Sequence, residues 1–363
     1  MKHIFYLSGD FIDLGKEEVM SLFEIKDSKL LNTLLITNLD DDSKSLNNIF
    51  PHLALTKHIY RFLFECKVND LIDSMKKYDW ASVYKDDFCL RVTNLHDDTI
   101  TKKSINEKNN KINFSEKNLA GYIWCSLSNP KVNLENPKTL IQLFITKDKA
   151  YCGLLIYENK EDFESRKAHL RPFHHPSSMH PKIARALVNI SGVKDKEILL
   201  DPFCGTGGFL IESGLMGIRS IGYDISKIII NGCIENLKHF KIKKRNYKIR
   251  KQNAISMADK FDCAVTDLPY GLNSNAMMDY DKKDWKKHRL NLKIQKEGFY
   301  ENLEKFYLSF LKNLRKNLKK KAVIVFPSYA DYKRLLKQAN FKIEKEFEQY
   351  IHRSLTRKIV KIS

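Results

Sequence analysis

Short apolar runs alternate with longer amphipathic segments through the second half of this 363-residue chain. Apolar runs of about four to eight residues have the length of buried strands, and the segments between them carry apolar residues at helical spacing. Strands that alternate with helices predict a parallel sheet with helices on both faces, which is a doubly wound α/β domain. The expected strands are 197–200, 220–224, 248–252, 261–267 and 322–328, and the expected helices are 209–217, 226–240 and 329–339.

The first half of the chain has a different pattern. Residues 1 to about 60 alternate short apolar runs with polar turns, which predicts a small α+β unit. A tract rich in Lys, Asn and Ser at 101–118 is too polar to pack, so we expect an exposed loop there. The highly charged residues 158–172 indicate a connection between domains. Further elements are expected as strands at 89–95, 140–146 and 150–157 and a helix near 116–127.

A glycine-rich segment, DPFCGTGG at 201–208, lies where the first strand of the α/β domain leads into a helix. This position is the usual ligand crevice of doubly wound sheets. Asp201 would end the first strand, where a carboxylate can bind an ammonium group such as that of S-adenosylmethionine. Asp224 would end the next strand, 23 residues later, where it can accept hydrogen bonds from ribose hydroxyls. The loop departs from GxGxxG, which argues against a dinucleotide.

A second motif, DLPYG at 267–271, directly follows a predicted strand. An amine on an aromatic ring is a poor nucleophile because its lone pair is delocalised. Asp267 can accept a hydrogen bond from such an amine and take up its charge or proton, and the Leu268 carbonyl can accept the second hydrogen. Pro269 fixes the turn, and Tyr270 offers a face on which a flipped base can stack. The two motifs together predict methylation of an exocyclic amine.

The positive charge of the chain lies in its second half. Residues 1–158 contain 21 Lys and Arg and 22 Asp and Glu, whereas residues 159–363 contain 42 and 22, giving net charges of −1 and +20. Such a surface favours a polyanionic partner, because each cation placed near a phosphate releases counterions. A merely solvated surface is the alternative. Three basic clusters contribute to this charge, at 241–251, 282–289 and 312–321. In and just before the middle cluster, Trp285 and Tyr280 suit stacking on RNA bases.

Four segments carry a resemblance to a known family: RPFHHPSSMHPKIARALVNISG at 171–192, DPFCGTGGFLIESGLMG at 201–217, DLPYG at 267–271 and HRSLTRKI at 352–359. They are similar to segments of archaeal THUMP-domain RNA methyltransferases, in particular the tRNA guanosine-10 N2-methyltransferases. The resemblance implies S-adenosylmethionine as cofactor and tRNA as partner. It is strongest from residue 171 onward and weaker in the first half of the chain.

The same resemblance implies the domain organisation. A Rossmann-like class I S-adenosylmethionine-dependent methyltransferase domain would occupy 173–363, preceded by an α+β ferredoxin-like/THUMP region. Within that region, residues 1–50 would be the ferredoxin-like unit, 51–158 the THUMP domain and 159–172 the linker. The two N-terminal domains would bind the acceptor end of tRNA, and we expect a monomer.

The expected site residues follow from the two motifs and the resemblance. Cys204 is interpreted as a small packing residue of the cofactor loop, and Asn253 has an amide that can bond the adenine edge. Cofactor binding is expected from Asp201, Cys204, Gly205, Thr206, Gly207, Asp224, Ile225, Asn253, Ala254 and Asp267. Catalytic roles are expected for Asp267, Leu268, Pro269 and Tyr270.

Several alternatives stay open. The family commonly has a proline where this chain has Leu268, and a related group that modifies an acceptor-stem guanosine often has leucine there. The target is therefore guanosine 10 or another guanosine of tRNA or ribosomal RNA, and mono- and dimethylation are both compatible with the motifs. Related motifs also serve methylation of DNA adenine or protein glutamine. A non-catalytic RNA-binding protein and an NAD-dependent oxidoreductase are the rivals from other classes.

The cysteines, the histidines and the length of the apolar runs bear on the cellular location of the protein and on metal binding. The seven cysteines lie far apart without a CxxC pair, so the sequence predicts neither a zinc site nor a disulfide framework and favours the cytoplasm. His174, His175 and His180 crowd one segment, but nothing nearby completes a metal-ligand spacing, so no metal is expected. No apolar run approaches the roughly 20 residues of a membrane span, so no membrane association is expected.

Overall fold

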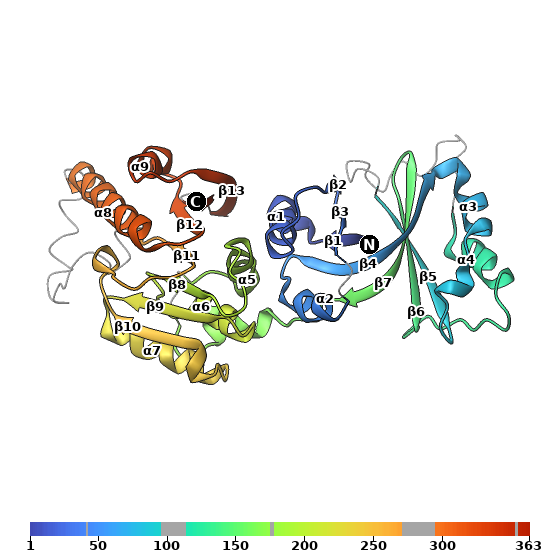
Figure 1. The fold of residues 1–363 in the computed structure, drawn as a ribbon, viewed down its shortest axis with the longest axis horizontal. Helices are drawn as coiled ribbons and strands as arrows, with labels where there is room; N and C mark the ends of the chain where they lie inside the picture. Colours follow the sequence, from blue (N-terminus) through green and yellow to red (C-terminus); the bar gives the residue numbers. More distant parts are fainter. Residues whose placement is uncertain (41–42, 96–113, 175–177, 271–294, 353–354) are drawn as a thin grey trace. The chain divides into compact units, whose positions relative to one another are not determined.

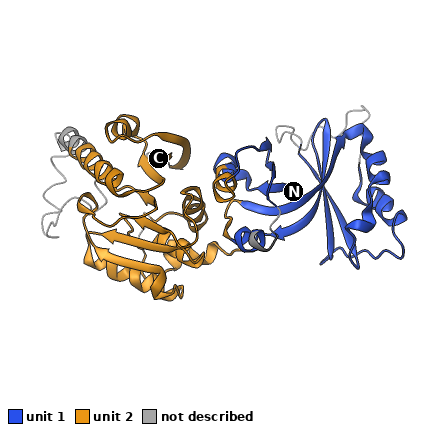
Figure 2. Cartoon of the chain, viewed as in Figure 1, with its two compact units in different colours: residues 1–16, 25–51, 56–160 blue, residues 17–24, 52–55, 161–363 orange. Residues whose placement is uncertain are grey.

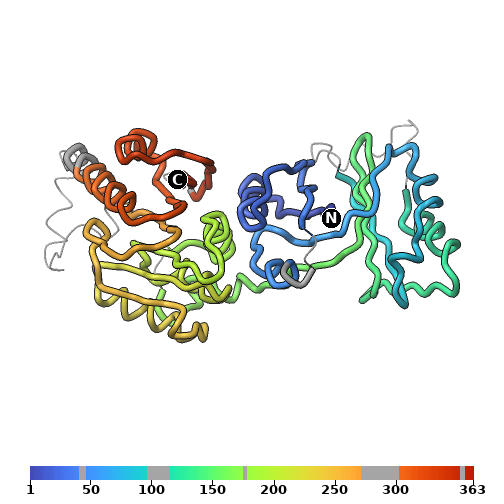
Figure 3. The backbone as a smooth tube through the Cα atoms, viewed as in Figure 1, coloured from blue at the N-terminus to red at the C-terminus, as the bar shows by residue number. Residues whose placement is uncertain are grey.

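The computed structural model describes residues 1–40, 43–95, 114–174, 178–270, 295–352 and 355–363 (Figure 1). The described chain divides into two compact units, coloured separately in Figure 2. The N-terminal unit comprises residues 1–16, 25–51 and 56–160, and the C-terminal unit comprises residues 17–24, 52–55 and 161–363. The C-terminal unit therefore includes two short segments from early in the chain, which are blue in the tube of Figure 3.

A seven-stranded sheet forms the N-terminal unit, in the order β2-β3-β1-β4-β7-β6-β5. Neighbouring strands are antiparallel, except that β5 and β6 are parallel. Two helices, α3 and α4, pack on β5 and β6 around the buried Trp80. The strands are β1 (Lys2–Leu7), β2 (Lys29–Leu31), β3 (Leu34–Asn38), β4 (Thr56–Lys67), β5 (Phe88–Asn94), β6 (Thr139–Ile145) and β7 (Lys149–Glu158). The helices in this part of the chain are α1 (Ile12–Leu22), α2 (Ser43–Ile49), α3 (Leu71–Lys77) and α4 (Glu116–Cys125), and the second half of α1 belongs to the C-terminal unit.

The elements predicted after residue 60 are confirmed within one or two residues, as β5, β6, β7 and α4. The predicted boundary at residue 50 does not separate two sheets, because β1 pairs directly with β4, placing His3 opposite Arg61. The division into ferredoxin-like and THUMP domains therefore stays a prediction. The polar tract at 101–118 lies mostly outside the described residues.

The C-terminal unit contains a second seven-stranded sheet, in the order β10-β9-β8-β11-β12-β14-β13. Strands β8 to β12 are parallel to one another, which confirms the predicted doubly wound sheet. The sheet continues through β14 and β13, which are antiparallel and were not predicted. The strands are β8 (Ile198–Asp201), β9 (Arg219–Asp224), β10 (Tyr247–Lys251), β11 (Cys263–Asp267), β12 (Ala322–Pro327), β13 (Ile343–His352) and β14 (Leu355–Ile362).

The direction of winding reverses beside β8. After β8 the chain adds β9 and β10 on one side, and then crosses to add β11 and β12 on the other. The carboxyl ends of β8 and β11 therefore flank a topological switch point, where doubly wound sheets usually bind ligands.

Helices cover both faces of this sheet (Figure 1). Leu210 and Leu237 from α6 and α7 bury one face, whereas Phe310 and Leu335 from α8 and α9 bury the other. The predicted helices at 209–217, 226–240 and 329–339 correspond to three of them. The helices are α5 (Pro181–Ile190), α6 (Gly208–Leu215), α7 (Lys227–His239), α8 (Gln295–Asn317) and α9 (Tyr332–Gln338).

Helices α5 and α8 were not predicted from the pattern. The basic cluster at 312–321 begins within α8, where Lys312 and Lys316 are exposed while Leu311 and Leu314 are buried. These lysines therefore form the solvated face of an amphipathic helix. Within the described residues, none of the helices has the length and apolarity of a membrane span.

Candidate active site at the carboxyl edge of the parallel sheet

The glycine-rich loop connects β8 to α6 through a tight left-handed turn. Gly205 and Gly207 have φ of +48° and +87°, a region that residues with a Cβ adopt at a cost. A Cβ on Gly207 would also lie 2.8 Å from the Cys233 sulfur in α7. The Cys204 amide donates to the Tyr223 carbonyl at 2.8 Å, which ties the loop to β9. Local backbone geometry, rather than packing alone, therefore requires these glycines.

Asp201 lies at the end of β8 and is 1% exposed. Its Oδ1 accepts hydrogen bonds from the Thr266 hydroxyl at 3.0 Å and from the Phe203 amide at 3.3 Å. Burial raises the pKa of Asp201 to about 8, although these two bonds oppose the shift. The carboxyl group is thus held rigidly between β8 and β11, where a cation would stabilise its ionised form.

Asp224 lies at the end of the neighbouring strand β9, and its Oδ1 accepts a hydrogen bond from the Ser226 amide at 2.8 Å. Ser226 in turn caps α7. Ile225 between them is half-buried. At the end of β10, Asn253 is exposed and accepts a hydrogen bond from the Ile255 amide at 3.1 Å. The structure thus brings the predicted residues of three parallel strands to one edge, because parallel strands share the direction of their carboxyl ends.

Two predicted cofactor residues are enclosed by protein. Ala254 is 2% exposed and belongs to the core cluster beneath β9 and β11, and Cys204 is 4% exposed among the side chains of α6 and α7. Cys204 is therefore a packing residue, as its side chain suggested. Thr206 is also buried, and its hydroxyl lies 3.0 Å from the Ser178 hydroxyl.

Asp267 ends β11 and makes a buried ion pair that the sequence reasoning missed. Its Oδ2 accepts a hydrogen bond from Arg357 Nη2 of β14 at 3.0 Å, and its Oδ1 accepts one from the Tyr270 hydroxyl. Arg357 Nε also donates to the Tyr270 hydroxyl at 3.0 Å. Burial raises the pKa of Asp267, and the Arg357 charge opposes that rise. Arg357 belongs to the segment HRSLTRKI, but nothing in that segment indicates which side chain it meets.

The turn after Asp267 is braced by two tyrosines that the sequence reasoning also missed. Tyr307 of α8 donates to the Pro269 carbonyl at 2.6 Å, and the Tyr329 hydroxyl donates to the Tyr270 carbonyl. Leu268 is 2% exposed, and its amide donates to Val325 of β12 at 3.1 Å. Tyr307 lies 38 residues from Pro269 in sequence, and Tyr329 lies 59 residues from Tyr270. No local pattern marks them.

Some predicted features lie outside the described residues. These are Gly271 of the second motif, His175, and the basic cluster at 282–289 with Tyr280 and Trp285. Among the described residues, no group of three or more His, Cys, Asp or Glu side chains is placed to hold a metal ion. Of the histidines named above, His180 caps α5 by accepting from the Lys182 amide.

Comparisons with known proteins agree with this geometry. The family model of the RMKL-like methyltransferase domain matches residues 168–281. A tRNA (guanine(10)-N2)-dimethyltransferase of Methanothermobacter thermautotrophicus is 32% identical over 312 residues, covering 85% of this chain and 82% of that protein. The Pyrococcus abyssi protein of the same name is 28% identical and covers 98% of both chains. A tRNA (guanine(6)-N2)-methyltransferase of Methanocaldococcus jannaschii is 32% identical, but over only 31% of this chain and 33% of that protein.

Proposed function

This chain belongs to the tRNA (guanine(10)-N2)-dimethyltransferase family, and from that premise we propose that it methylates the exocyclic N2 of guanosine 10 in tRNA with S-adenosylmethionine as methyl donor. The observation that carries the proposal is the row of acidic strand ends, Asp201, Asp224 and Asp267, along one edge of the parallel sheet. Two acidic groups suit the cofactor, and the third suits the amine of the target base.

The side chains at this edge fit the cofactor. When bound, S-adenosylmethionine supplies an electrophilic methyl group. Asp201 would pair with its ammonium group, which would also stabilise the ionised form of this buried carboxyl. Asp224 would accept hydrogen bonds from the ribose hydroxyls. The left-handed turn at Gly205 and Gly207 lets the backbone approach the ligand closely.

The end of β10 would hold the adenine part of the cofactor. Asn253 is exposed there, and its amide can bond the edge of the base. Ile225 supplies apolar surface, and the buried Ala254 supports this edge from the core, while Thr206 and Cys204 keep the loop in shape through the contacts described above.

Asp267 would act on the target amine. Both of its carboxylate oxygens already accept hydrogen bonds, from Tyr270 and Arg357, so the base must replace one donor. The Tyr270 hydroxyl is the one that leaves, because a buried arginine cannot give up its counterion cheaply. Once released, the Tyr270 ring can stack on the base, and the Leu268 carbonyl can accept the second amine hydrogen. Arg357 then keeps Asp267 ionised and oriented.

The first methylation leaves one hydrogen on N2, so the same acceptor can serve a second round. We propose that dimethylguanosine is formed when the site admits the first methyl group, in keeping with the name of the relatives. The N-terminal unit would serve as the THUMP-type region that binds tRNA, and the basic second half would contribute phosphate contacts.

The experiment that tests the function incubates the purified chain with methyl-labelled S-adenosylmethionine and an unmodified tRNA transcript. Mass spectrometry of fragments should find N2-methylguanosine or its dimethyl form at position 10. A transcript in which adenosine replaces guanosine 10 is the control and should stay unlabelled. Label in DNA or bulk protein alone would contradict the proposal.

The second candidate is an N2-guanosine methyltransferase for another site, such as guanosine 6. Leu268 favours it, because the related acceptor-stem group often has leucine there. The guanine(6) relative aligns with less than a third of this chain, so the overall likeness favours position 10. Fragment mapping in the same experiment decides between them, since label confined to guanosine 6 would replace the first proposal with the second.

A further inference from the structure

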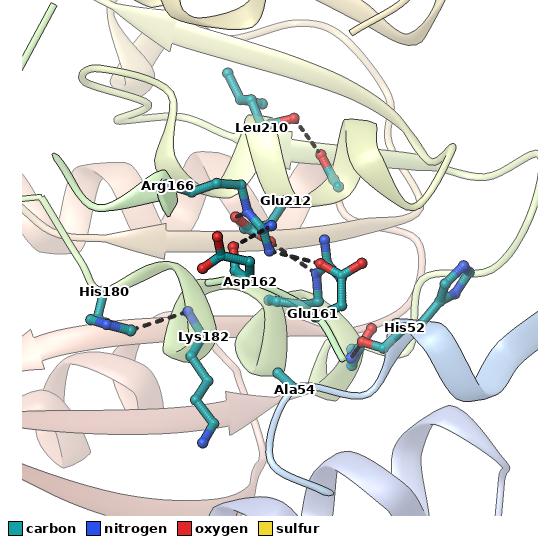
Figure 4. Close-up of polar contacts among 12 residues, drawn as sticks. His52, Ala54, Glu161, Asp162, Arg166, His180, Lys182, Leu210 and Glu212 are labelled. Carbon is teal, nitrogen blue, oxygen red and sulfur yellow. Dashed lines mark hydrogen bonds and ion pairs between the residues drawn. The ribbon is translucent and has the colours of Figure 1, made fainter. Parts of the chain in front are cut away.

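Three arginines gather beside the first turns of α6, and two of them are fully paired. Glu212 of α6 accepts from Arg166 Nε at 2.9 Å and from Arg185 Nε at 2.9 Å. Glu161 accepts from Arg166 Nη2 at 3.0 Å and lies 3.2 Å from Arg185 Nη1. Figure 4 shows Arg166 among Glu212, Glu161 and Asp162. The two glutamates therefore balance the charge of these two arginines.

The third arginine, Arg171, has no counterion in this cluster. It is 3% exposed, and its Nε donates to the Arg166 carbonyl at 2.9 Å. Its terminal nitrogens, Nη1 and Nη2, have no hydrogen-bond partner within the described part of the chain. Burial lowers the pKa of Arg171, and the nearby Arg166 charge lowers it as well, whereas the charge of the already paired Glu212 opposes the shift. A buried guanidinium with two unsatisfied nitrogens is costly, so it indicates a missing anion.

The free end of Arg171 lies against the amino terminus of α6. Its Nη1 is 3.8 Å from the position that a Cβ on Gly208, the first residue of the helix, would take. The residue before it, Gly207, has no side chain, so the first amides of α6 receive no side-chain cap from it. A helix amino terminus attracts anions. Here this attraction adds to that of the positively charged Arg171 guanidinium.

Asn236 of α7 connects the Arg171 segment to the cofactor loop. Its amide nitrogen donates to the Phe173 carbonyl at 2.7 Å and to the Thr206 carbonyl at 3.0 Å, and its oxygen accepts from the Phe173 amide at 3.0 Å. Phe173 follows Arg171 by two residues, and Thr206 precedes the helix. The unsatisfied guanidinium is therefore held beside the loop that follows Asp201.

We propose that Arg171 and the amino terminus of α6 bind the carboxylate of the amino-acid part of S-adenosylmethionine. This inference rests on the proposed function, since it requires that cofactor. The amino-acid part carries an ammonium and a carboxylate on one carbon atom, and the loop offers one complement to each, in Asp201 and Arg171. An arginine also matches a carboxylate with two parallel hydrogen bonds. An RNA phosphate is the less suitable occupant, because Arg171 is buried.

The test compares S-adenosylmethionine with decarboxylated S-adenosylmethionine, which keeps the amine and lacks only the carboxylate. Binding is measured by calorimetry on the full chain, so no substrate or turnover is needed. We expect the wild type to prefer the intact cofactor, and Arg171→Met to weaken its binding about 30-fold or more. Binding of the decarboxylated compound should change by no more than about threefold, because the group that Arg171 contacts is absent from it.

Two further variants control for folding and charge. Arg171→Lys keeps the charge without the paired donors, so we expect an intermediate loss for the intact cofactor only. Arg219→Met removes an exposed arginine at the opposite, amino end of β9 and should change neither affinity. Because the readout is the ratio of two affinities of one variant, partial unfolding does not mimic the expected result.

The other outcomes are equally clear. Equal weakening of both ligands by Arg171→Met, or weakening of neither, would overturn the carboxylate assignment while leaving the proposed function intact. Loss of tRNA binding with normal cofactor binding would assign the site to a phosphate and overturn it as well. A wild-type chain that binds no S-adenosylmethionine would instead contradict the proposed function itself.

Discussion

Asp267 and Arg357 show how one residue changes the chemistry of another from far along the chain. Burial raises the pKa of the Asp267 carboxyl group, and the Arg357 guanidinium opposes that rise, so a partner 90 residues away favours the ionised form. The same arginine orients the Tyr270 hydroxyl. A hydrogen-bond acceptor for a weakly basic amine must be both ionised and fixed, and Arg357 serves both needs.

We predict that Arg357→Gln lowers kcat/KM for tRNA about 10- to 100-fold near neutral pH and moves the acidic limb of the pH profile to higher pH. Without the guanidinium, the pKa of Asp267 rises further, so the carboxylate is protonated at a higher pH. The check is kcat/KM between about pH 6 and 9. Arg357→Lys should fall in between. In an Asp267→Asn background, Arg357→Gln should lower kcat/KM little further, because both substitutions remove the same ion pair. An unshifted profile would argue against this role.

Asp201 makes stability depend on pH in the opposite sense to an ordinary paired carboxylate. Its pKa is about 8 in the folded chain and near 3.8 when exposed, so the folded state keeps a proton that the unfolded state loses. The unfolded state therefore binds fewer protons between these values, and stability falls as pH rises through that window. Because Asp201 is almost fully buried, solvent screens this effect little.

We predict that Asp201→Asn becomes more stable than the wild type as pH rises. In the absence of cofactor, the difference in unfolding free energy should grow by about 1 kcal/mol per pH unit between about pH 5 and 8. Urea unfolding at several pH values measures it. Asparagine can still accept the Thr266 and Phe203 hydrogen bonds, so the variant isolates the charge. Parallel stability curves for the two proteins would show that the carboxyl group has an ordinary pKa.

At the scale of elements, the loop between β8 and α6 depends on backbone conformation. Gly207 combines a left-handed φ of +87° with close packing on Cys233, whereas Gly217 at the end of α6 has φ of +81° and open space around it. Substitution of Gly217 therefore measures the free-energy cost of the left-handed backbone alone, whereas substitution of Gly207 adds the cost of the steric contact with Cys233.

We predict that Gly207→Ala destabilises the chain by about 2 kcal/mol or more and weakens S-adenosylmethionine binding, because strain and a steric clash add. Gly217→Ala should cost only about 1 kcal/mol and leave cofactor binding unchanged. Urea unfolding and calorimetry measure both effects. Cys233→Ala should recover part of the loss in the Gly207→Ala protein, and its failure to do so would place the damage elsewhere.

The elements of the α/β domain were largely predictable, and the exceptions have physical reasons. Strands β8, β9 and β11 are short apolar runs between helices, so period and spacing identify them. Helix α8 was missed because its lysines dominate the local composition, although buried apolar residues recur at helical spacing, at Leu303, Tyr307, Leu311 and Leu314. β13 and β14 carry charged residues at many positions, so their pattern does not resemble a buried strand.

On the scale of the whole molecule, the C-terminal unit is not one continuous stretch of sequence. Lys361 of β14 is 6% exposed and pairs with Glu17 at 2.7 Å, and its ammonium group also donates to Ser21 at 2.9 Å. Glu18 accepts from the Ala54 and Leu55 amides, at 2.8 Å each, and from Asn189. The segments at 17–24 and 52–55 are therefore part of this unit.

We predict that Lys361→Met destabilises the full chain by about 3 kcal/mol, because it leaves the buried Glu17 carboxylate without its counterion. In a fragment of residues 161–363 the same substitution should have a much smaller effect, since Glu17 is absent and only the more distant Glu344 carboxylate, 4.0 Å from the Lys361 ammonium group, remains. Urea unfolding of the four proteins measures this. The fragment itself should be less stable than the full chain. Equal effects of Lys361→Met in both backgrounds would contradict this account.

What the sequence determined by itself is local in origin. Alternating apolar runs led to the doubly wound sheet, and acidic residues at the ends of those runs led to Asp201, Asp224 and Asp267, because parallel strands place their carboxyl ends together. Glycines in a left-handed turn are equally visible in a linear sequence.

Only the tertiary structure decided which distant side chains complete the site. Arg357 and Tyr307 reach it from another strand and another helix, and Arg171 lies beside the first residue of α6, although these side chains look like any other arginine or tyrosine in the sequence. Burial, counterions and unsatisfied nitrogens arise when segments pack against each other. A spacing rule within one segment contains no information about that packing.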